Sequence, residues 1–147
     1  MHQVYLGLGS NLGNKEENIR KAITLINEQI GTVVRQSALF YSEPWGFESE
    51  NQFVNAAICV STTLTPHQIL EANQRIERFL GKTEAHATER TSSINPQPSD
   101  ITYHDRPIDI DILLYDDLHI DEPQLKVPHP LMNERPFVMI PLSEIRK

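Results

Sequence analysis

Positively charged residues are scarce in this chain of 147 residues: 13 lysines and arginines face 20 aspartates and glutamates, which gives a net charge of −7 at pH 7. Binding to nucleic-acid duplexes depends on cationic patches and counterion release, so we expect no nucleic-acid partner. Cysteine is scarce too. The single cysteine cannot form an intrachain disulfide, which is typical of a protein in the reducing cytoplasm.

Long hydrophobic runs are absent from the sequence. No stretch approaches the roughly 18–20 apolar residues that a membrane helix needs, so we expect no membrane partner. The N-terminal apolar run has no basic region before it and soon meets Gly7 and Gly9, which does not fit a signal peptide. The length favours a single domain over residues 1–147, and we expect it to be a cytoplasmic monomer.

Hydrophobic patterns predict a chain of alternating strands and helices. Strands are expected over 4–9, 33–41, 53–62 and 108–115, with a further short strand near 118–120. Two helical patterns lie between them. The order βαββαβ predicts an α+β, ferredoxin-like sandwich with helices on one face of an antiparallel sheet, followed by a proline-rich C-terminal extension.

Capping residues set the expected bounds of both helices. Asn14 is suited to cap the first helix, and Glu17 follows three residues later, where its side chain can reach back to the cap. Thr65 is suited to cap the second helix, with Gln68 at the same spacing. Glycines at positions 31 and 81 are expected to end the two helices.

One polar stretch, residues 81–106, does not fit a minimal sandwich. It has almost no apolar periodicity and includes the segment NPQP at 95–98. Loops longer than about 12–15 residues without secondary structure are uncommon in compact domains. The stretch is therefore either a disordered insertion, which costs little loop-closure entropy, or a mobile lid beside a site.

The strongest chemical signal is the segment DRPIDIDILL at residues 105–114. Side chains alternate along a strand, so Asp109 and Asp111 share one face and the isoleucines at 108, 110 and 112 share the other. Two carboxylates about 6.5–7 Å apart can hold one or two hard cations, and Mg²⁺ favours one or two carboxylates plus phosphate oxygens. The alternative is the solvated face of an edge strand, although neighbouring like charges repel there.

Cationic side chains lie on both sides of this pair in the sequence. Arg106 precedes Asp109, and His129 and Arg135 follow the last strand. Guanidinium groups match phosphate oxygens bidentately, so carboxylates with several such donors suit a magnesium–polyphosphate ligand. Each arginine taken alone is better explained as an ordinary surface residue.

Three other patterns have both a functional and a structural interpretation. The glycine-rich segment 7–13 lacks the third glycine of a dinucleotide loop, so it is either a place of close backbone approach or a tight turn. Phe53 and Asn55 share one strand face and could bind a flat heterocycle, or could simply belong to the core. Gln74 and Glu77 are three residues apart on one helix and could meet a ligand jointly, or could be solvated.

Together these motifs resemble the 6-hydroxymethyl-7,8-dihydropterin pyrophosphokinase family of folate biosynthesis. The resemblance runs from about residue 4 to residue 143. It is carried by LGSNLG at 8–13, FVNAA at 53–57, QRIE at 74–77, RPIDIDILLY at 106–115 and VPHP at 127–130, and by Arg135 and Phe137. It implies the ferredoxin-like fold.

The resemblance also implies a reaction and a set of site residues. The reaction is transfer of pyrophosphate from ATP to the pterin hydroxymethyl group, with release of AMP. Asp109 and Asp111 would hold two Mg²⁺ ions, Arg106 would be catalytic beside them, and residues 81–106 would be a lid loop. The pterin would contact Glu43, Pro44, Trp45, Gly46, Phe53, Asn55 and Phe137. The nucleotide would contact Gln74, Glu77, Lys82, Arg106, Ile112, His129 and Arg135.

The chemistry fits what these residues offer. Phosphoryl-type transfer needs positioning and charge neutralisation more than covalent help, and a metal pair can lower the pKa of the pterin hydroxyl and clamp the triphosphate for in-line attack on the β-phosphorus. No residue stands out as a general base. Two other hypotheses are a non-enzymatic module that binds an acidic or aromatic metabolite, and a homologue that binds both substrates without turnover. Production of AMP discriminates among the three.

Overall fold

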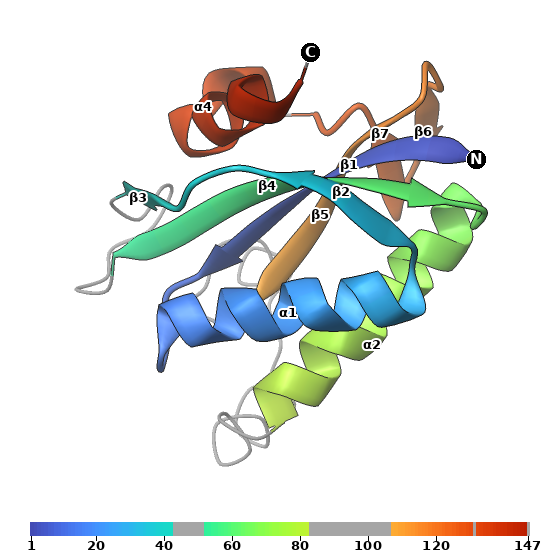
Figure 1. The fold of residues 1–147 in the computed structure, drawn as a ribbon. Coiled ribbons are helices and arrows are strands. Elements are labelled where there is room, and N and C mark those ends of the chain that lie inside the picture. The colour runs from blue at the N-terminus through green and yellow to red at the C-terminus, as the bar shows by residue number, and fades with distance from the viewer. Residues whose placement is uncertain (43–51, 83–106, 131, 147) are drawn as a thin grey trace.

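An antiparallel sheet carries the fold in the computed structural model, which describes residues 1–42, 52–82, 107–130 and 132–146 (Figure 1). Its strand order is β2-β4-β1-β5, with β3 also paired to β4. A separate two-stranded sheet joins β6 and β7. The strands are β1 (His2–Ser10), β2 (Thr32–Gln36), β3 (Phe40–Ser42), β4 (Phe53–Thr62), β5 (Asp109–Tyr115), β6 (Ile120–Glu122) and β7 (Leu125–Val127).

Helices cover both faces of the large sheet (Figure 1). Helices α1 (Lys15–Gln29) and α2 (Pro66–Lys82) lie on one face, where they pack on side chains such as Leu6, Ile58 and Ile110. Helix α4 (Pro136–Ile145) lies on the other face, and the short 3₁₀ helix η2 (Met132–Glu134) precedes it. Among the described residues, no helix has the length and apolarity needed to cross a membrane.

The alternation of side chains along the strands explains the two cores. Odd-numbered residues of β1 and β4, such as Tyr5 and Cys59, point to the α4 face and form a small cluster with Leu142. The even-numbered residues point to α1 and α2 and form the larger core. The predicted antiparallel sheet with two helices on one face is confirmed. The helix on the opposite face was not predicted.

The capping predictions are mostly confirmed. The Asn14 side chain accepts a hydrogen bond from the backbone N–H of Glu17 at 3.2 Å. Thr65 and Gln68 form a reciprocal pair: Thr65 N donates to Gln68 Oε1 at 2.8 Å and Gln68 N donates to Thr65 Oγ1 at 3.2 Å. The side chain of Glu17 was expected to reach back to Asn14, which is wrong. It bonds Arg20 instead at 2.7 Å, because the guanidinium one turn on offers a charged donor.

Several bounds differ from the expected ones. The strand predicted over 33–41 is two strands, β2 and β3, because Ser37 turns inward between them and bonds Ala57 through both its backbone N–H and its hydroxyl oxygen. The short strand expected near 118–120 is β6, at Ile120–Glu122, and its partner β7 was not predicted. Helix α2 continues one residue past Gly81. The predicted lid, apart from its first two residues, lies outside the described residues.

Close packing against β4 requires a glycine at position 31. A Cβ on Gly31 would overlap the carbonyl oxygen of Ser61 and lie 2.8 Å from Thr62 Cβ, so the turn after α1 approaches β4 too closely for any side chain. We expect Gly31→Ala to reduce the free energy of unfolding by roughly 3 kcal/mol and the Tm by about 10 °C. Gly81→Ala is the control, because a Cβ there meets nothing within 4 Å. It should raise stability by about 0.5–1 kcal/mol. Thermal denaturation of both variants checks the pair, and equal shifts would contradict the packing argument.

Candidate active site

Two glycines of β1 lie between the polar residues of the neighbouring strands. Gly9 pairs with Asn55 of β4 on one side and with Asp109 of β5 on the other. Gly7 pairs likewise with Ala57 and Asp111. Paired residues of adjacent strands point to the same face of a sheet, so one row runs Asn55–Gly9–Asp109 on the α4 face. Gly9 places no side chain of its own between the Asn55 amide and the Asp109 carboxylate, whereas the Leu113 side chain covers Gly7.

The Asn55 amide has a fixed orientation above Gly9. Its Nδ2 donates to Ser42 Oγ at 2.9 Å and to the Phe40 carbonyl oxygen at 3.3 Å. A Cβ on Gly9 would lie 3.1 Å from Asn55 Oδ1 and 3.6 Å from Phe53 Cδ1, so the amide oxygen and the Phe53 ring both border this glycine. A buried hydrogen-bond acceptor and the edge of an aromatic ring therefore both lie next to the Cβ position of Gly9.

Asp109 and Asp111 are half-buried on the same face, as the alternation predicted, while Ile108, Ile110 and Ile112 are buried. Strand β5 is the end strand of the described sheet. The described residues hold no group of three or more histidine, cysteine, aspartate and glutamate side chains that could hold a metal ion. One or two carboxylates are the number of protein ligands that Mg²⁺ commonly takes, with water or phosphate oxygens as the others.

Three further predicted residues gather near this row. The backbone N–H of His129 donates to the carbonyl oxygen of Leu113 at 3.1 Å, which ties the segment after β7 to β5. Burial and the nearby Arg135 guanidinium lower the pKa of His129, and Asp109 acts in the opposite direction. The buried Arg135 precedes α4 and its guanidinium carbon lies 5.7 Å from the centre of the Phe137 ring. A cation, an imidazole and an aromatic ring thus lie beside the carboxylate face.

Glu77 of α2 reaches the outer edge of β5. Its Oε2 accepts a hydrogen bond from the backbone N–H of Ile110 at 2.7 Å, so the backbone of Ile110 faces away from β1. Alternate residues of an antiparallel strand direct their backbone groups to the same side, so Ile112 also presents its N–H and C=O to this edge. Gln74 lies on the same helix and is exposed. The edge therefore offers backbone groups that a planar base can pair with.

Comparison with known proteins then decides the family. The sequence model described as 7,8-dihydro-6-hydroxymethylpterin-pyrophosphokinase matches residues 5–147. The chain belongs to this pyrophosphokinase family. A relative from Porphyromonas gingivalis, named 2-amino-4-hydroxy-6-hydroxymethyldihydropteridine pyrophosphokinase, is 40% identical over 143 residues, which are 97% of this chain and 89% of the relative.

Two longer proteins are also similar to this chain. A folate synthesis bifunctional protein of Arabidopsis thaliana is 34% identical over 97% of this chain and 27% of its own length. A crystal structure of Plasmodium falciparum HPPK-DHPS with SDX-DHP superposes with a TM-score of 0.70 at 14% identity. It covers 99% of this chain, which spans 40% of that chain, and at this identity the likeness shows the fold alone.

Not every residue that the pyrophosphokinase resemblance implied has a described position. Glu43, Pro44, Trp45, Gly46 and Arg106 lie outside the described residues. Lys82 is the last residue of α2. Conversely, Phe40 and Ser42 orient Asn55 and had no predicted role, because the partner of a side-chain amide cannot be identified without the pairing of β3 with β4.

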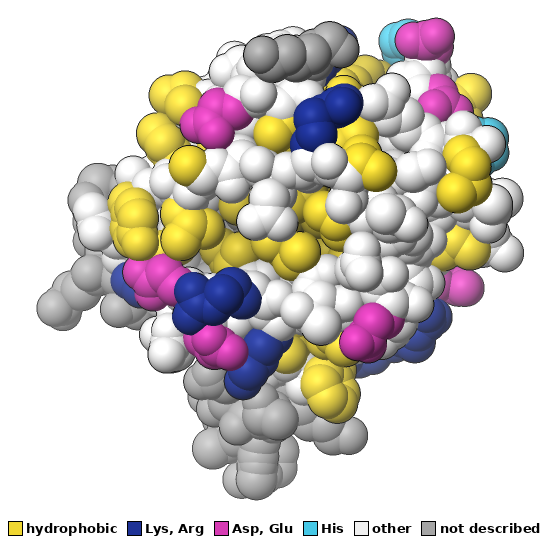
Figure 2. All heavy atoms as spheres, in the orientation of Figure 1, with side chains coloured by type: hydrophobic (Ala, Val, Ile, Leu, Met, Phe, Trp, Pro, Cys, Tyr) yellow, Lys and Arg dark blue, Asp and Glu magenta, His cyan; other side chains and the backbone are white. Residues whose placement is uncertain are grey.

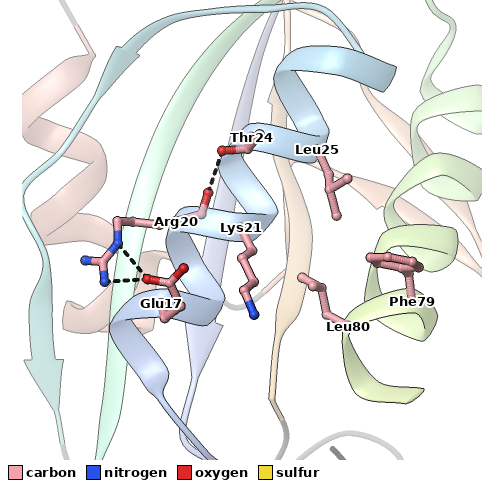
Figure 3. A pocket seen from close by; sticks show the side chains of 7 residues that line it. All are labelled: Glu17, Arg20, Lys21, Thr24, Leu25, Phe79 and Leu80. Carbon is pink, nitrogen blue, oxygen red and sulfur yellow. Dashed lines mark hydrogen bonds and ion pairs between the residues drawn. The ribbon is translucent and has the colours of Figure 1, made fainter. Parts of the chain in front are cut away.

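A groove of about 410 Å³ lies on the opposite face, between α1 and α2 (Figure 3). Leu25, Phe79 and Leu80 point into it, and Lys21 lies at its side. None of the residues predicted to bind pterin, ATP or metal lines it. Because the groove lies between α1 and α2 and has none of these residues in its lining, it is separate from the row Asn55–Gly9–Asp109. Lysine and arginine side chains are interspersed with acidic ones around α1 in the space-filling view (Figure 2).

Proposed function

We propose that this pyrophosphokinase transfers pyrophosphate from ATP to the hydroxymethyl group of 6-hydroxymethyl-7,8-dihydropterin and releases AMP. The observation that carries the proposal is the row Asn55–Gly9–Asp109, which places a hydrogen-bonding amide and a carboxylate on the same face of the sheet with a glycine between them. Adjacent strands lie about 4.8 Å apart, so roughly 10 Å separate the two end strands of the row. A flat bicyclic ring on Gly9 can bond Asn55 while its substituent points toward Asp109.

The pterin subsite follows from the same geometry. Asn55 Oδ1 would accept a hydrogen bond from the ring, and Phe53 and Phe137 would stack on its faces. The orientation of Asn55 is set by Ser42 and the Phe40 carbonyl, so little side-chain entropy is lost when the ring binds. We also assign Glu43, Pro44, Trp45 and Gly46 to this subsite from the resemblance.

The nucleotide subsite lies toward the edge of β5. Ile112 would pair with adenine through its backbone, Gln74 and Glu77 would face the nucleotide from α2, and His129 and Arg135 would contact phosphate oxygens. Lys82 and Arg106 complete this set by resemblance. Arg135 is buried beside the carboxylate face, so its interaction with phosphate would be weakly screened by water.

The proposed reaction is an in-line displacement. The pterin hydroxyl oxygen forms a bond to the β-phosphorus, the bond from that phosphorus to the α,β-bridging oxygen breaks, and AMP leaves with that oxygen while the hydroxyl proton passes to solvent. Asp109 and Asp111 would hold two Mg²⁺ ions, whose chemistry is to neutralise the triphosphate and lower the pKa of the hydroxyl. His129 and Arg135 would add positive charge or hydrogen bonds on the same side.

Other parts of the sequence interpretation also enter this proposal. The strand order β2-β4-β1-β5, in which the short strand β3 also pairs with β4, supports a ferredoxin-like topology. The single buried cysteine supports residence in the cytoplasm. We further propose that residues 1–147 act as a single domain and a monomer, with residues 81–106 as a lid.

AMP release tests the proposed function. The full chain with MgATP should produce AMP only when 6-hydroxymethyl-7,8-dihydropterin is present, and EDTA should abolish the production because the carboxylates then lack their ions. AMP is quantified by chromatography, with boiled protein as the control. Binding of pterin and ATP by calorimetry without any AMP would overturn the transferase and favour a binding protein that shares the fold.

A further inference from the structure

Helix α2 buries one side-chain amide that has no described partner. Asn73 is 1% exposed, and within the described part of the chain neither its Nδ2 nor its Oδ1 makes a hydrogen bond. Burial of an unpaired amide is costly, and the great majority of buried polar side chains in folded proteins are paired. Asn73 lies in the buried stripe of α2 between Ile69 and Ile76, where an apolar residue would pack without this cost. Asn73 therefore offers a hydrogen-bond donor and an acceptor that no described protein group uses.

The position of Asn73 is set by two contacts between α2 and β5. The Tyr115 hydroxyl donates to the carbonyl oxygen of Leu64, just before α2, at 2.6 Å. Glu77 accepts from Ile110 N at 2.7 Å, so the helix runs antiparallel to β5. Asn73 lies one turn, about 6 Å, before Glu77, and Ile112 lies about 6.6 Å along β5 from Ile110. Asn73 is therefore level with Ile112.

The helix also orients Asn73 toward the edge of β5. Residues three and four apart share a side of a helix, so Asn73 lies on the same side as Leu70 and Glu77. Both of these are half-buried, whereas Asn73 lies between them and the centre of the buried stripe. A base that pairs with the outward backbone of Ile112 would enter past Leu70 and Glu77 and meet the amide behind them.

We propose that Asn73 reads the N6 and N7 atoms of adenine in the ATP site, which makes it a specificity-determining residue for the purine. This inference rests on the proposed function. If the Ile112 backbone pairs with the N1 and N6 atoms of adenine, the second N6 hydrogen and the N7 acceptor still lack hydrogen-bond partners. Asn73 Oδ1 accepts that hydrogen and Nδ2 donates to N7, which is the bidentate pairing that asparagine makes with adenine. Guanine places a carbonyl oxygen at the N6 position, where it faces two acceptors.

Removal of N7 from the nucleotide and of the amide from the protein tests the pairing. Calorimetric titration of the full chain compares MgATP with the magnesium complex of 7-deaza-ATP, in which a C–H group replaces N7. The wild-type chain should bind 7-deaza-ATP about 10-fold more weakly. Asn73→Leu should bind ATP at least about 10-fold more weakly than wild type, and should bind both nucleotides with equal affinity.

Asn18→Leu is the matched control for a buried asparagine. Asn18 is 5% exposed and its Nδ2 donates to the Leu12 carbonyl oxygen at 2.9 Å, so its replacement should lower the Tm and leave the preference for ATP over 7-deaza-ATP unchanged. Asn73→Leu should keep or raise the Tm, because an unpaired amide is replaced by an apolar side chain of similar shape. A Tm that falls as far as in Asn18→Leu overturns the proposal, because the amide is then structural.

The nucleotide preference gives the second decisive outcome. An unchanged preference for ATP over 7-deaza-ATP in Asn73→Leu overturns the assignment of Asn73. The AMP assay on the wild-type chain separates this from failure of the proposed function. Pterin-dependent AMP with an unchanged preference rejects only the role of Asn73, whereas the expected binding pattern without AMP supports that role and rejects the transferase.

Discussion

Asp109→Asn and Asp111→Asn should each reduce pterin-dependent AMP formation by about 10³-fold or more, because loss of one carboxylate charge removes several kcal/mol of metal-mediated stabilisation of the transition state. Both side chains are half-buried on the α4 face of β5, and asparagine keeps their shape. The free energy of unfolding should change by less than about 0.5 kcal/mol, because neither carboxylate belongs to the core. AMP formation at saturating MgATP and pterin, together with thermal denaturation, measures the two effects.

Asp117→Asn is the matched control for this pair. Asp117 is exposed in the turn that follows β5, so the same change in charge occurs six residues after Asp111 and away from the face with the glycines. It should leave AMP formation within about twofold of wild type. If either Asp109→Asn or Asp111→Asn kept wild-type activity, or if Asp117→Asn lost as much, the carboxylates of β5 would not be the metal-binding residues.

The sequence predicts the placement of these carboxylates because side chains alternate regularly over residues 109–112 of the strand. Once 108–115 is a strand, Asp109 and Asp111 must share a face, and the buried isoleucines decide which face is the core. The helix start at Thr65 is predictable for a similar reason, since the reciprocal bonds with Gln68 involve residues only three positions apart. Local spacing therefore determines both features.

Contacts between distant segments of the chain could not be predicted from the sequence. Helix α4 begins at Pro136 and contains Pro141, so its local signal is weak, and its packing on Cys59 and Leu113 stabilises it. The pairing of Asn55 with Ser42 depends on β3 folding back onto β4. The bond from Ile110 to Glu77 joins residues 33 positions apart. Each of these follows from how the chain folds back on itself, which no single stretch specifies.

The glycine between Asn55 and Asp109 gives the second large expected effect. Gly9→Val should weaken pterin binding and lower AMP formation by about 10²-fold, because displacements near 1 Å in a substrate site have effects of this size. A Cβ at Gly9 already lies 3.1 Å from Asn55 Oδ1, and the two methyl groups of valine would extend over the floor where the ring is proposed to lie. Calorimetric titration with the pterin measures the affinity.

A series of substitutions of increasing size at Gly9 and Gly7 distinguishes steric blocking of the proposed pterin site from distortion of the sheet. Gly9→Ala should have a smaller effect than Gly9→Val, because its methyl group displaces the Asn55 amide by only a few tenths of an ångström. Gly7→Ala should keep pterin affinity within about threefold, because its Cβ meets the flexible end of Leu113 at 3.3 Å rather than the amide. Equal losses in Gly7→Ala and Gly9→Val would show that the effect comes from distortion of β1. A graded loss confined to Gly9 would place the pterin on the row Asn55–Gly9–Asp109.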